Sequence, residues 1–187
     1  IEKGSDLLVS VRFSDDFSDD LLLIAESPSG ESQSVSMPRS LRDPIASATI
    51  RKVKEPLLYR IESVSKNSER FEVGVFEHPA VLQSDASIQS PTYTQQDDKT
   101  ISNTRRVSIV DGAQVRWSLK LNKPVVSAEW IDENGQSALL EGNPQNPTEY
   151  SIRNTPTESM RYRLKLTDAE GRSENTAEEF VVKVIPN

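Results

Sequence analysis

The residues with the most evident chemical potential lie in an acidic run near the start of the chain. Asp15, Asp16, Asp19 and Asp20 place four carboxylates within six residues, between two predicted strands. Oxygen-only ligands of this kind suit Ca²⁺. The run lacks the spacing and the glycine of an EF-hand loop, however. We therefore interpret it as a solvated acidic turn, with a calcium loop formed by these four aspartates as the alternative.

The usual residues of nucleophilic and metal-assisted catalysis are not present as a set. The single histidine, His78, lies between Glu77 and Pro79, and no serine stands in a Gly-x-Ser-x-Gly motif. A chain with one histidine and no cysteine offers no zinc site. It also has no glycine-rich loop for a phosphate group. The sequence thus predicts no catalytic residue, no cofactor and no metal apart from the calcium alternative.

Three aromatic residues, Tyr93, Trp117 and Trp130, could form a small carbohydrate platform if they were exposed. Trp117 is in phase with Val115 and Leu119, so we expect it in a core. The sequence leaves the face of Trp130 open. Aromatic residues make up 6% of the chain, which is low for a protein that hydrolyses sugars.

Composition narrows the function classes further. The chain has 187 residues and a formal net charge of −7, which argues against binding to nucleic acid or to an anionic membrane surface. The longest apolar run, residues 21–25, is far shorter than the ~20 residues of a membrane span. Any membrane contact is therefore expected only through segments outside this sequence.

Apolar residues recur with period two, which is typical of half-buried antiparallel strands. The alternating segments are residues 7–13, 115–121, 162–166 and 180–184. Turn signals separate them. Asn134-Gly135, between the apolar segments 128–131 and 138–140, predicts a hairpin with a type I′ turn, which needs positive φ at both residues. The sequence therefore predicts an all-β protein.

Landmarks in the first half of the chain recur in the second half, 103 to 109 residues later. The pairs are Gly4 and Gly112, Gly30 and Gly135, Tyr59 and Tyr162, Phe71 and Phe180, and Pro79 and Pro186. A spacing of about 100 residues is the size of one β-sandwich. We therefore expect two domains, residues 1–79 and 80–187, with a junction at 77–81. Residues 83–104 are predicted to be a polar, irregular lead-in, with one edge strand around 86–88.

The segment Tyr162-Arg-Leu-Lys-Leu-Thr-Asp-Ala-Glu-Gly171 resembles the penultimate strand and following turn of bacterial immunoglobulin-like and fibronectin-III-like domains. The motifs from Pro91-Thr-Tyr-Thr94 to Asn122-Lys-Pro-Val125 are similar to tandem sandwich segments of large bacterial membrane-anchored proteins of unknown function. The resemblance implies two tandem immunoglobulin-like antiparallel β-sandwiches in an extracytoplasmic setting, tethered by residues not included here.

These observations favour a non-catalytic structural or interaction module whose partners are other proteins or neighbouring domains of the same chain. The alternative is a ligand-binding accessory domain for carbohydrate or Ca²⁺. Because there is no disulfide, packing must hold each sandwich together, and we expect Tyr59, Trp117 and Tyr162 to be core anchors.

Overall fold

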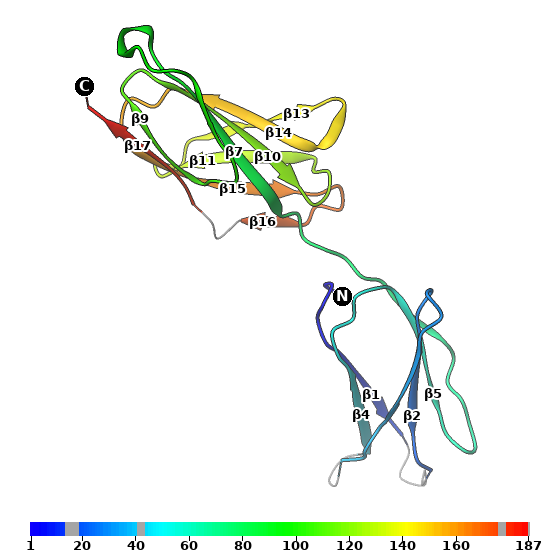
Figure 1. Ribbon diagram of the computed structural model, residues 1–187. Coiled ribbons are helices and arrows are strands. Elements are labelled where there is room, and N and C mark those ends of the chain that lie inside the picture. Colours follow the sequence, from blue (N-terminus) through cyan, green and yellow to red (C-terminus); the bar gives the residue numbers. More distant parts are fainter. Residues whose placement is uncertain (14–18, 41–43, 176–178, 187) are drawn as a thin grey trace. The chain divides into compact units, whose positions relative to one another are not determined.

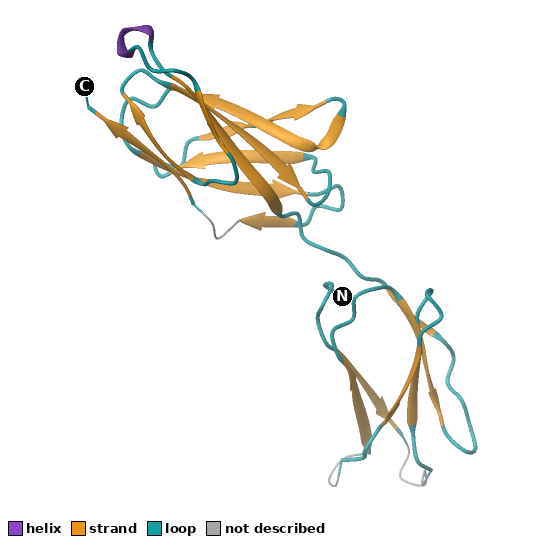
Figure 2. Cartoon of the chain, viewed as in Figure 1, coloured by secondary structure: helices purple, strands orange, loops and turns teal. Residues whose placement is uncertain are grey.

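The computed structural model describes residues 1–13, 19–40, 44–175 and 179–186. In that part of the chain it consists of strands, turns and one short 3₁₀ helix, Thr92–Thr94 (Figure 2). Two compact units are formed, unit 1 from Ile1–Glu77 and unit 2 from His78–Asn187 (Figure 1). Each sheet lies within one unit. The predicted all-β class is confirmed.

Unit 2 is a sandwich of two sheets. One sheet has the order β13-β14-β10-β7-β8, with bounds Glu141–Asn143, Asn146–Asn154, Gln114–Leu121, Val81–Gln89 and Lys99–Ile101. The other has the order β12-β11-β15-β17-β9, with bounds Ser137–Leu139, Ser127–Asp132, Met160–Thr167, Phe180–Ile185 and Arg106–Val110. Strand β16, Ser173–Asn175, pairs with β15.

The strand order of unit 2 is that of the immunoglobulin fold. Strands β7, β10, β14 and β13 occupy the positions of A, B, E and D, and β11, β15 and β17 those of C, F and G. The pairs between these strands are antiparallel, whereas β9 runs parallel to β17. Unit 2 is therefore the immunoglobulin-like sandwich that the sequence predicts.

Unit 1 has the same order with fewer strands. Strands β1 (Leu7–Arg12) and β4 (Ile45–Ile50) form a two-stranded sheet. The facing sheet has the order β3-β2-β5-β6, with bounds Ser32–Ser36, Leu22–Glu26, Leu57–Glu62 and Phe71–Val73. Strand β1 is thus the counterpart of β10, β4 of β14, β5 of β15 and β6 of β17.

The core of unit 2 is closed and rich in aromatic rings. The ring of Phe180 lies 5.2 Å from that of Trp117 and 4.7 Å from that of Trp130, which in turn stacks on Tyr162 at 5.2 Å. All four side chains are buried. Trp117 and Tyr162 are core residues as predicted, and the structure places Trp130 in the same core.

The core of unit 1 is smaller and built from aliphatic residues. Its buried members include Val9, Leu23, Ala25, Ala46 and Ile50. Tyr59, which the sequence predicts as an anchor, is only partly buried and stacks on the ring of Phe71 at 5.2 Å.

Two hairpin turns of unit 2 are stabilised in the same way, by an aspartate side chain that accepts hydrogen bonds from the turn backbone. The Asp132 carboxylate accepts hydrogen bonds from the backbone N–H groups of Asn134 and Gln136, at 2.9 and 2.8 Å. Asp168 does the same for residues 170 and 172. Gly135 and Gly171 each have positive φ.

Asn134 does not have positive φ, so the predicted type I′ turn is wrong, although the predicted hairpin forms. The aspartate side chain stabilises a longer loop in which only the glycine needs positive φ.

The prediction that residues 83–104 are irregular is also wrong. This segment contains most of β7, and β7 is a central strand between β10 and β8. Its inward positions are Ser84, Ala86 and Ile88, and Ala86 lies opposite Trp117 in the register. A small side chain suffices beside a large ring, so the segment keeps a polar composition although it forms a central strand.

Candidate functional site

The structure leaves the candidate calcium loop incomplete. Asp15 and Asp16 lie outside the described residues. Asp19 is placed, and its Oδ2 atom accepts hydrogen bonds from the Ser65 hydroxyl and, at 3.1 Å, from the Ser65 backbone N–H. Among the described residues, no group of three or more His, Cys, Asp or Glu side chains is arranged to hold a metal ion. The calcium alternative therefore stays a prediction.

His78 lies at the start of unit 2, next to a structural contact. The Asn122 side-chain N–H donates to the His78 backbone carbonyl at 3.0 Å, and the Asn122 side-chain oxygen Oδ1 accepts from the Ala80 backbone N–H at 2.8 Å. One asparagine thus holds the backbone that leads into β7. Asn122 belongs to the Asn-Lys-Pro-Val motif, which gives that motif a structural role.

The three candidate carbohydrate-binding aromatics are not brought together on a surface. Trp117 is 0% and Trp130 3% exposed, because both form the core of unit 2. Tyr93 is 57% exposed, and its hydroxyl donates to the Asp111 carbonyl. A platform made of these three rings is therefore excluded, and Tyr93 alone is accessible.

The most strongly perturbed carboxyl group in the described structure is that of Asp168, which is 1% exposed. Its Oδ2 atom lies 2.7 Å from Lys123 Nζ and 3.0 Å from Arg172 Nε. The Lys123 hydrogen bond, the turn N–H and the two positive charges hold the pKa of Asp168 well below its usual value. All these partners belong to the turn or to the adjoining loop, so the cluster is structural.

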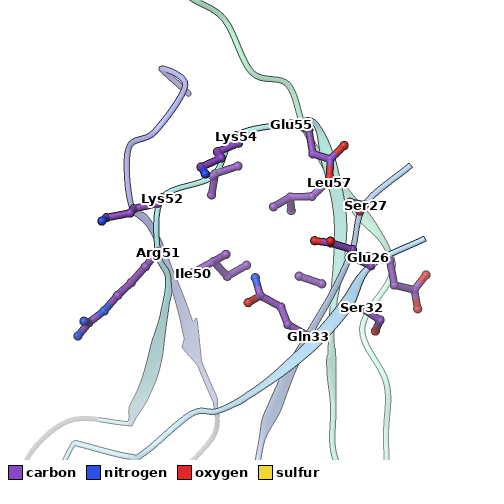
Figure 3. Close-up of a pocket in the computed structure, with 13 residues that line it drawn as sticks. Glu26, Ser27, Ser32, Gln33, Ile50, Arg51, Lys52, Lys54, Glu55 and Leu57 are labelled. Atoms are coloured by element: carbon purple, nitrogen blue, oxygen red, sulfur yellow. The ribbon is translucent and has the colours of Figure 1, made fainter. Parts of the chain in front are cut away.

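A first hollow, of about 290 Å³, lies at one end of unit 1. Figure 3 shows Gln33, Ile50 and Leu57 directed into it, while Arg51 and Lys52 extend away. The Glu26 carboxylate, on the rim, is paired at 2.7 Å with Arg60, which lowers the pKa of Glu26. The described lining thus combines an apolar floor with a rim of charged side chains.

A second and larger hollow of unit 1, of about 760 Å³, is an open groove between β1 and the strands β5 and β6. We call it the β1 groove. Its apolar lining is formed by seven residues, namely Val9, Val11, Phe13, Leu21, Tyr59, Ile61 and Phe71. Arg12, Lys66 and Glu69 are among the polar residues at its borders. The groove therefore gives solvent access to the side of the core of unit 1.

Comparison with unit 2 shows that the residues of this groove are core residues that are not fully covered. Phe71 is 39% exposed, whereas its counterpart Phe180 is 0% exposed. Tyr59 is partly buried, whereas Tyr162 is buried. In unit 2 the strand β7 adds Ala86 and Ile88 to the core on this side. Among the described residues of unit 1, no strand takes that position.

On the side away from β4, β1 pairs with no other strand in the described part of the chain. The Phe13 N–H donates to Pro44 at 3.0 Å, on the β4 side. Because inward and outward hydrogen-bonding positions alternate along an antiparallel strand, the N–H and C=O groups of Leu8, Ser10 and Arg12 point away from β4. In unit 2 the corresponding edge of β10 faces β7, where the Asn122 N–H donates to Ala80 at 3.0 Å.

Sequence reasoning did not find the β1 groove, because it treated the two halves as equivalent. The alternating strands do contain a difference in side-chain size between the two halves. Counted from Gly4 and Gly112, Val9 stands where the second half has Trp117, and both tryptophans of the chain belong to the second half. The first half therefore has less side-chain volume with which to close a core.

The fold thus places the chain among immunoglobulin-like sandwich proteins. No family model and no curated protein matches it. Solved structures similar to it include CopC from Methylosinus trichosporium OB3b, at 13% identity and a TM-score of 0.35, covering 59% of this chain and 96% of that one. Another is a chimeric titin Z1Z2 functionalized with an exogenous KLER peptide from decorin, at 16% identity and a TM-score of 0.32, covering 100% of this chain and 91% of that one.

None of the helices in the described part of the chain is long and apolar enough to cross a membrane.

Proposed function

We propose that the chain is a non-catalytic interaction module, a tandem sandwich segment of a larger extracytoplasmic bacterial protein. The motif resemblance in residues 91–125 and 162–171 supports the bacterial and extracytoplasmic setting, with the membrane tether outside this sequence. In this module unit 2 is a rigid, self-sufficient spacer, and unit 1 is the part that contacts a partner protein.

The observation that carries this proposal is the contrast between the closed core of unit 2 and the open core of unit 1. Phe180 is 0% exposed and Phe71 is 39% exposed at matching positions. Exposed apolar surface that is rimmed by polar groups is typical of protein interaction sites. By contrast, the most perturbed carboxylate, that of Asp168, is engaged by the turn and two cations, and this arrangement supports a non-catalytic role.

Site-specific photocrosslinking in the full-length protein tests this assignment. A photoreactive phenylalanine analogue replaces Phe71 in unit 1 or, as a matched control, Leu139 in unit 2, which is 70% exposed. We expect a discrete crosslinked protein at position 71 and none at 139. Crosslinks at position 139 alone would overturn the division of roles between the units.

The alternative, a ligand-binding accessory domain, retains one supporting observation, the exposed ring of Tyr93. Calorimetric titration of the chain with Ca²⁺ and with soluble oligosaccharides separates the two functions. We expect no heat of binding and no shift in melting temperature. A saturable heat that disappears in Tyr93→Ala, or a Ca²⁺ response that disappears in Asp19→Asn, would instead establish the accessory domain.

A further inference from the structure

We propose that unit 2 carries a binding site for a divalent oxyanion, a phosphate or sulfate group that is either free or part of a monoester, at the arginine pair Arg116 and Arg153. The inference goes beyond the proposed function, because it assigns a ligand to the unit that was described as a spacer. It follows from three features of the described structure, namely a pair of like charges without a counter-charge, a polar hollow that this pair lines, and a positive local charge.

The two arginines lie directly opposite each other on adjacent strands. Arg116 of β10 is aligned with Arg153 of β14 in the antiparallel register, and both side chains are exposed. The Cβ atoms of directly opposite residues lie about 5 Å apart, so two like charges there destabilise the sheet. The Arg116 guanidinium donates to the Ser151 hydroxyl at 3.3 Å, and in the described part of the chain neither arginine forms an ion pair with a carboxylate. The pair therefore lacks a counter-charge.

Elsewhere on the described strands of unit 2, aligned charges have opposite signs. On the same two strands Lys120 is aligned with Glu149. On the other sheet Lys165 is aligned with Glu129, and the two form an ion pair at 3.1 Å. The arginine pair breaks this pattern although acidic residues outnumber basic ones in the chain, 29 to 22. An unfavourable arrangement that the fold does not compensate is expected at functional sites.

A third hollow of the molecule, of about 320 Å³, is lined by both arginines. Strands β7, β8, β10 and β14 all contribute to it. The lining includes the Ser87 and Thr100 hydroxyl groups, whose oxygens lie 3.0 Å apart, and the side chains of Gln89 and Gln114. Small-molecule pockets have volumes of about 300–1,000 Å³, so this hollow accommodates an oxyanion together with a small group attached to it.

The charge of the hollow defines the class of ligand. Arg116, Arg153 and Lys99 are cationic and Asp98 is the one carboxylate of its described lining, so the local net charge is +2, in a chain whose net charge is −7. Asp98 Oδ1 accepts a hydrogen bond from the Ser90 backbone N–H at 3.3 Å. A dianion balances a charge of +2, and the planar fork of a guanidinium group matches two oxygens of one oxyanion. An extended polyanion needs a wider basic surface, which favours a small ligand here.

Calorimetric titration of the chain of residues 1–187 measures the binding. The probes are sulfate, inorganic phosphate and glycerol 3-phosphate at pH 8, where the phosphate groups are dianionic, with acetate as the monovalent control at constant ionic strength. We expect saturable binding of a dianion with a Kd of about 1 mM or lower, and binding of acetate at least about tenfold weaker. Tighter binding of glycerol 3-phosphate than of phosphate assigns the site to a monoester, and the reverse order assigns it to the free ion. No saturable binding of any dianion up to about 20 mM would overturn the proposal.

Neutral variants of the pair locate the bound anion. Arg116→Gln and Arg153→Gln each remove one charge and one fork of donors, so we expect each to weaken binding about tenfold or more. Lys120→Gln is the matched control, because Lys120 is exposed on the same face of β10 and does not line the hollow. We expect it to leave binding within about twofold. Equal losses in all three variants, or no loss in the two arginine variants, would overturn the proposal.

Arg116→Glu separates loss of binding from loss of folding. It gives the aligned pair opposite charges, as in Lys120 and Glu149, so we expect a melting temperature in ligand-free buffer at least as high as that of the unmodified chain. Anion binding should nevertheless be abolished, and added dianion should raise the melting temperature of the unmodified chain only. Retained binding, or a lower melting temperature of the variant, would contradict the proposed role of the pair.

An acidic segment of a partner protein is the competing occupant of the hollow. A hexaglutamate peptide represents it in the same titration. Tighter binding of this peptide than of each dianion would assign the hollow to an acidic polypeptide and overturn the proposal. These measurements concern unit 2, whereas the crosslinking at Phe71 concerns unit 1, so the anion site and the proposed function fail separately.

Discussion

Units 1 and 2 use the same strand order but close their cores differently. In unit 2 the sheet that contains β10 has five strands, and in unit 1 the sheet that contains β1 has two. The consequence is visible at matched side chains, since Phe180 is fully buried and Phe71 is not. Topology alone therefore does not determine whether a sandwich is sealed. In unit 2 the strand β7 beside β10 decides it, and β7 is largely polar in sequence.

The largest expected difference between the units comes from truncating the matched phenylalanines. Phe180→Ala removes a ring that contacts both tryptophans, so we expect unit 2 to lose about 3–5 kcal/mol of unfolding free energy. Phe71→Ala should cost unit 1 only about 1 kcal/mol, because the ring is partly solvated already. Urea unfolding followed by tryptophan fluorescence reports unit 2, which holds both tryptophans, and circular dichroism reports both units. Equal losses would contradict the contrast.

A smaller effect is expected from enlarging the residue of β7 that faces Trp117. Ala86 is 0% exposed, so Ala86→Leu overfills the core and should destabilise unit 2 by about 1–3 kcal/mol. Thermal unfolding of the Ala86→Leu chain measures this effect, with Gln89→Leu as the control at an exposed position of β7. No destabilisation would mean that unit 2 also has free volume at this strand.

The response to acid should separate the units as well. The pKa of Asp168 is lowered in the folded state, so its ionised form stabilises unit 2 at any pH above its unfolded value of about 4. That stabilisation is lost as the pH falls from about 4 towards the folded pKa. We expect Asp168→Asn to lower the melting temperature of unit 2 at pH 7, with a difference from the unmodified chain that shrinks below pH 4. Lys123→Met should act in the same direction.

The smallest effects are expected at the turns, where the two units are alike. Gly30 and Gly135 have φ values of 88° and 83° in matching hairpins, so a Cβ at either position costs about 1 kcal/mol. Gly30→Ala and Gly135→Ala should therefore destabilise their own units to a similar extent, as measured by thermal unfolding. Gly74→Ala, at a glycine without positive φ and with open space around it, is the neutral control. A large inequality between the first two would show that the turns differ after all.

The alternation of apolar residues was sufficient to predict the all-β class and the main core strands. It predicted β1, β10, β15 and β17 because their inward residues are apolar and most of their outward residues are polar. It failed for β7, whose inward residues include Ser84 and Ala86. The space for an inward residue of β7 is limited by Trp117 on the neighbouring strand β10. That pairing depends on the tertiary structure and cannot be read from the local sequence of β7.

The β1 groove could not be predicted from the sequence for a related reason. The residues of the β1 groove have the alternation of ordinary core residues, and Val9 and Val11 are inward on β1 as predicted. Their accessibility depends on which strand lies beside β1, and no local pattern encodes a neighbour. The turn residues, by contrast, were predictable because Asp168 and Gly171 interact within four positions of one another.

The parallel pairing at the last strand has a mechanical consequence. In unit 2, β9 and β17 run side by side over the pairs from Val181–Arg106 to Ile185–Val110, so a pull along the chain loads these hydrogen bonds together in shear. Unit 1 has a single parallel bridge, between Glu2 and Phe76, in the equivalent place. We therefore expect unit 1 to extend before unit 2 under tension.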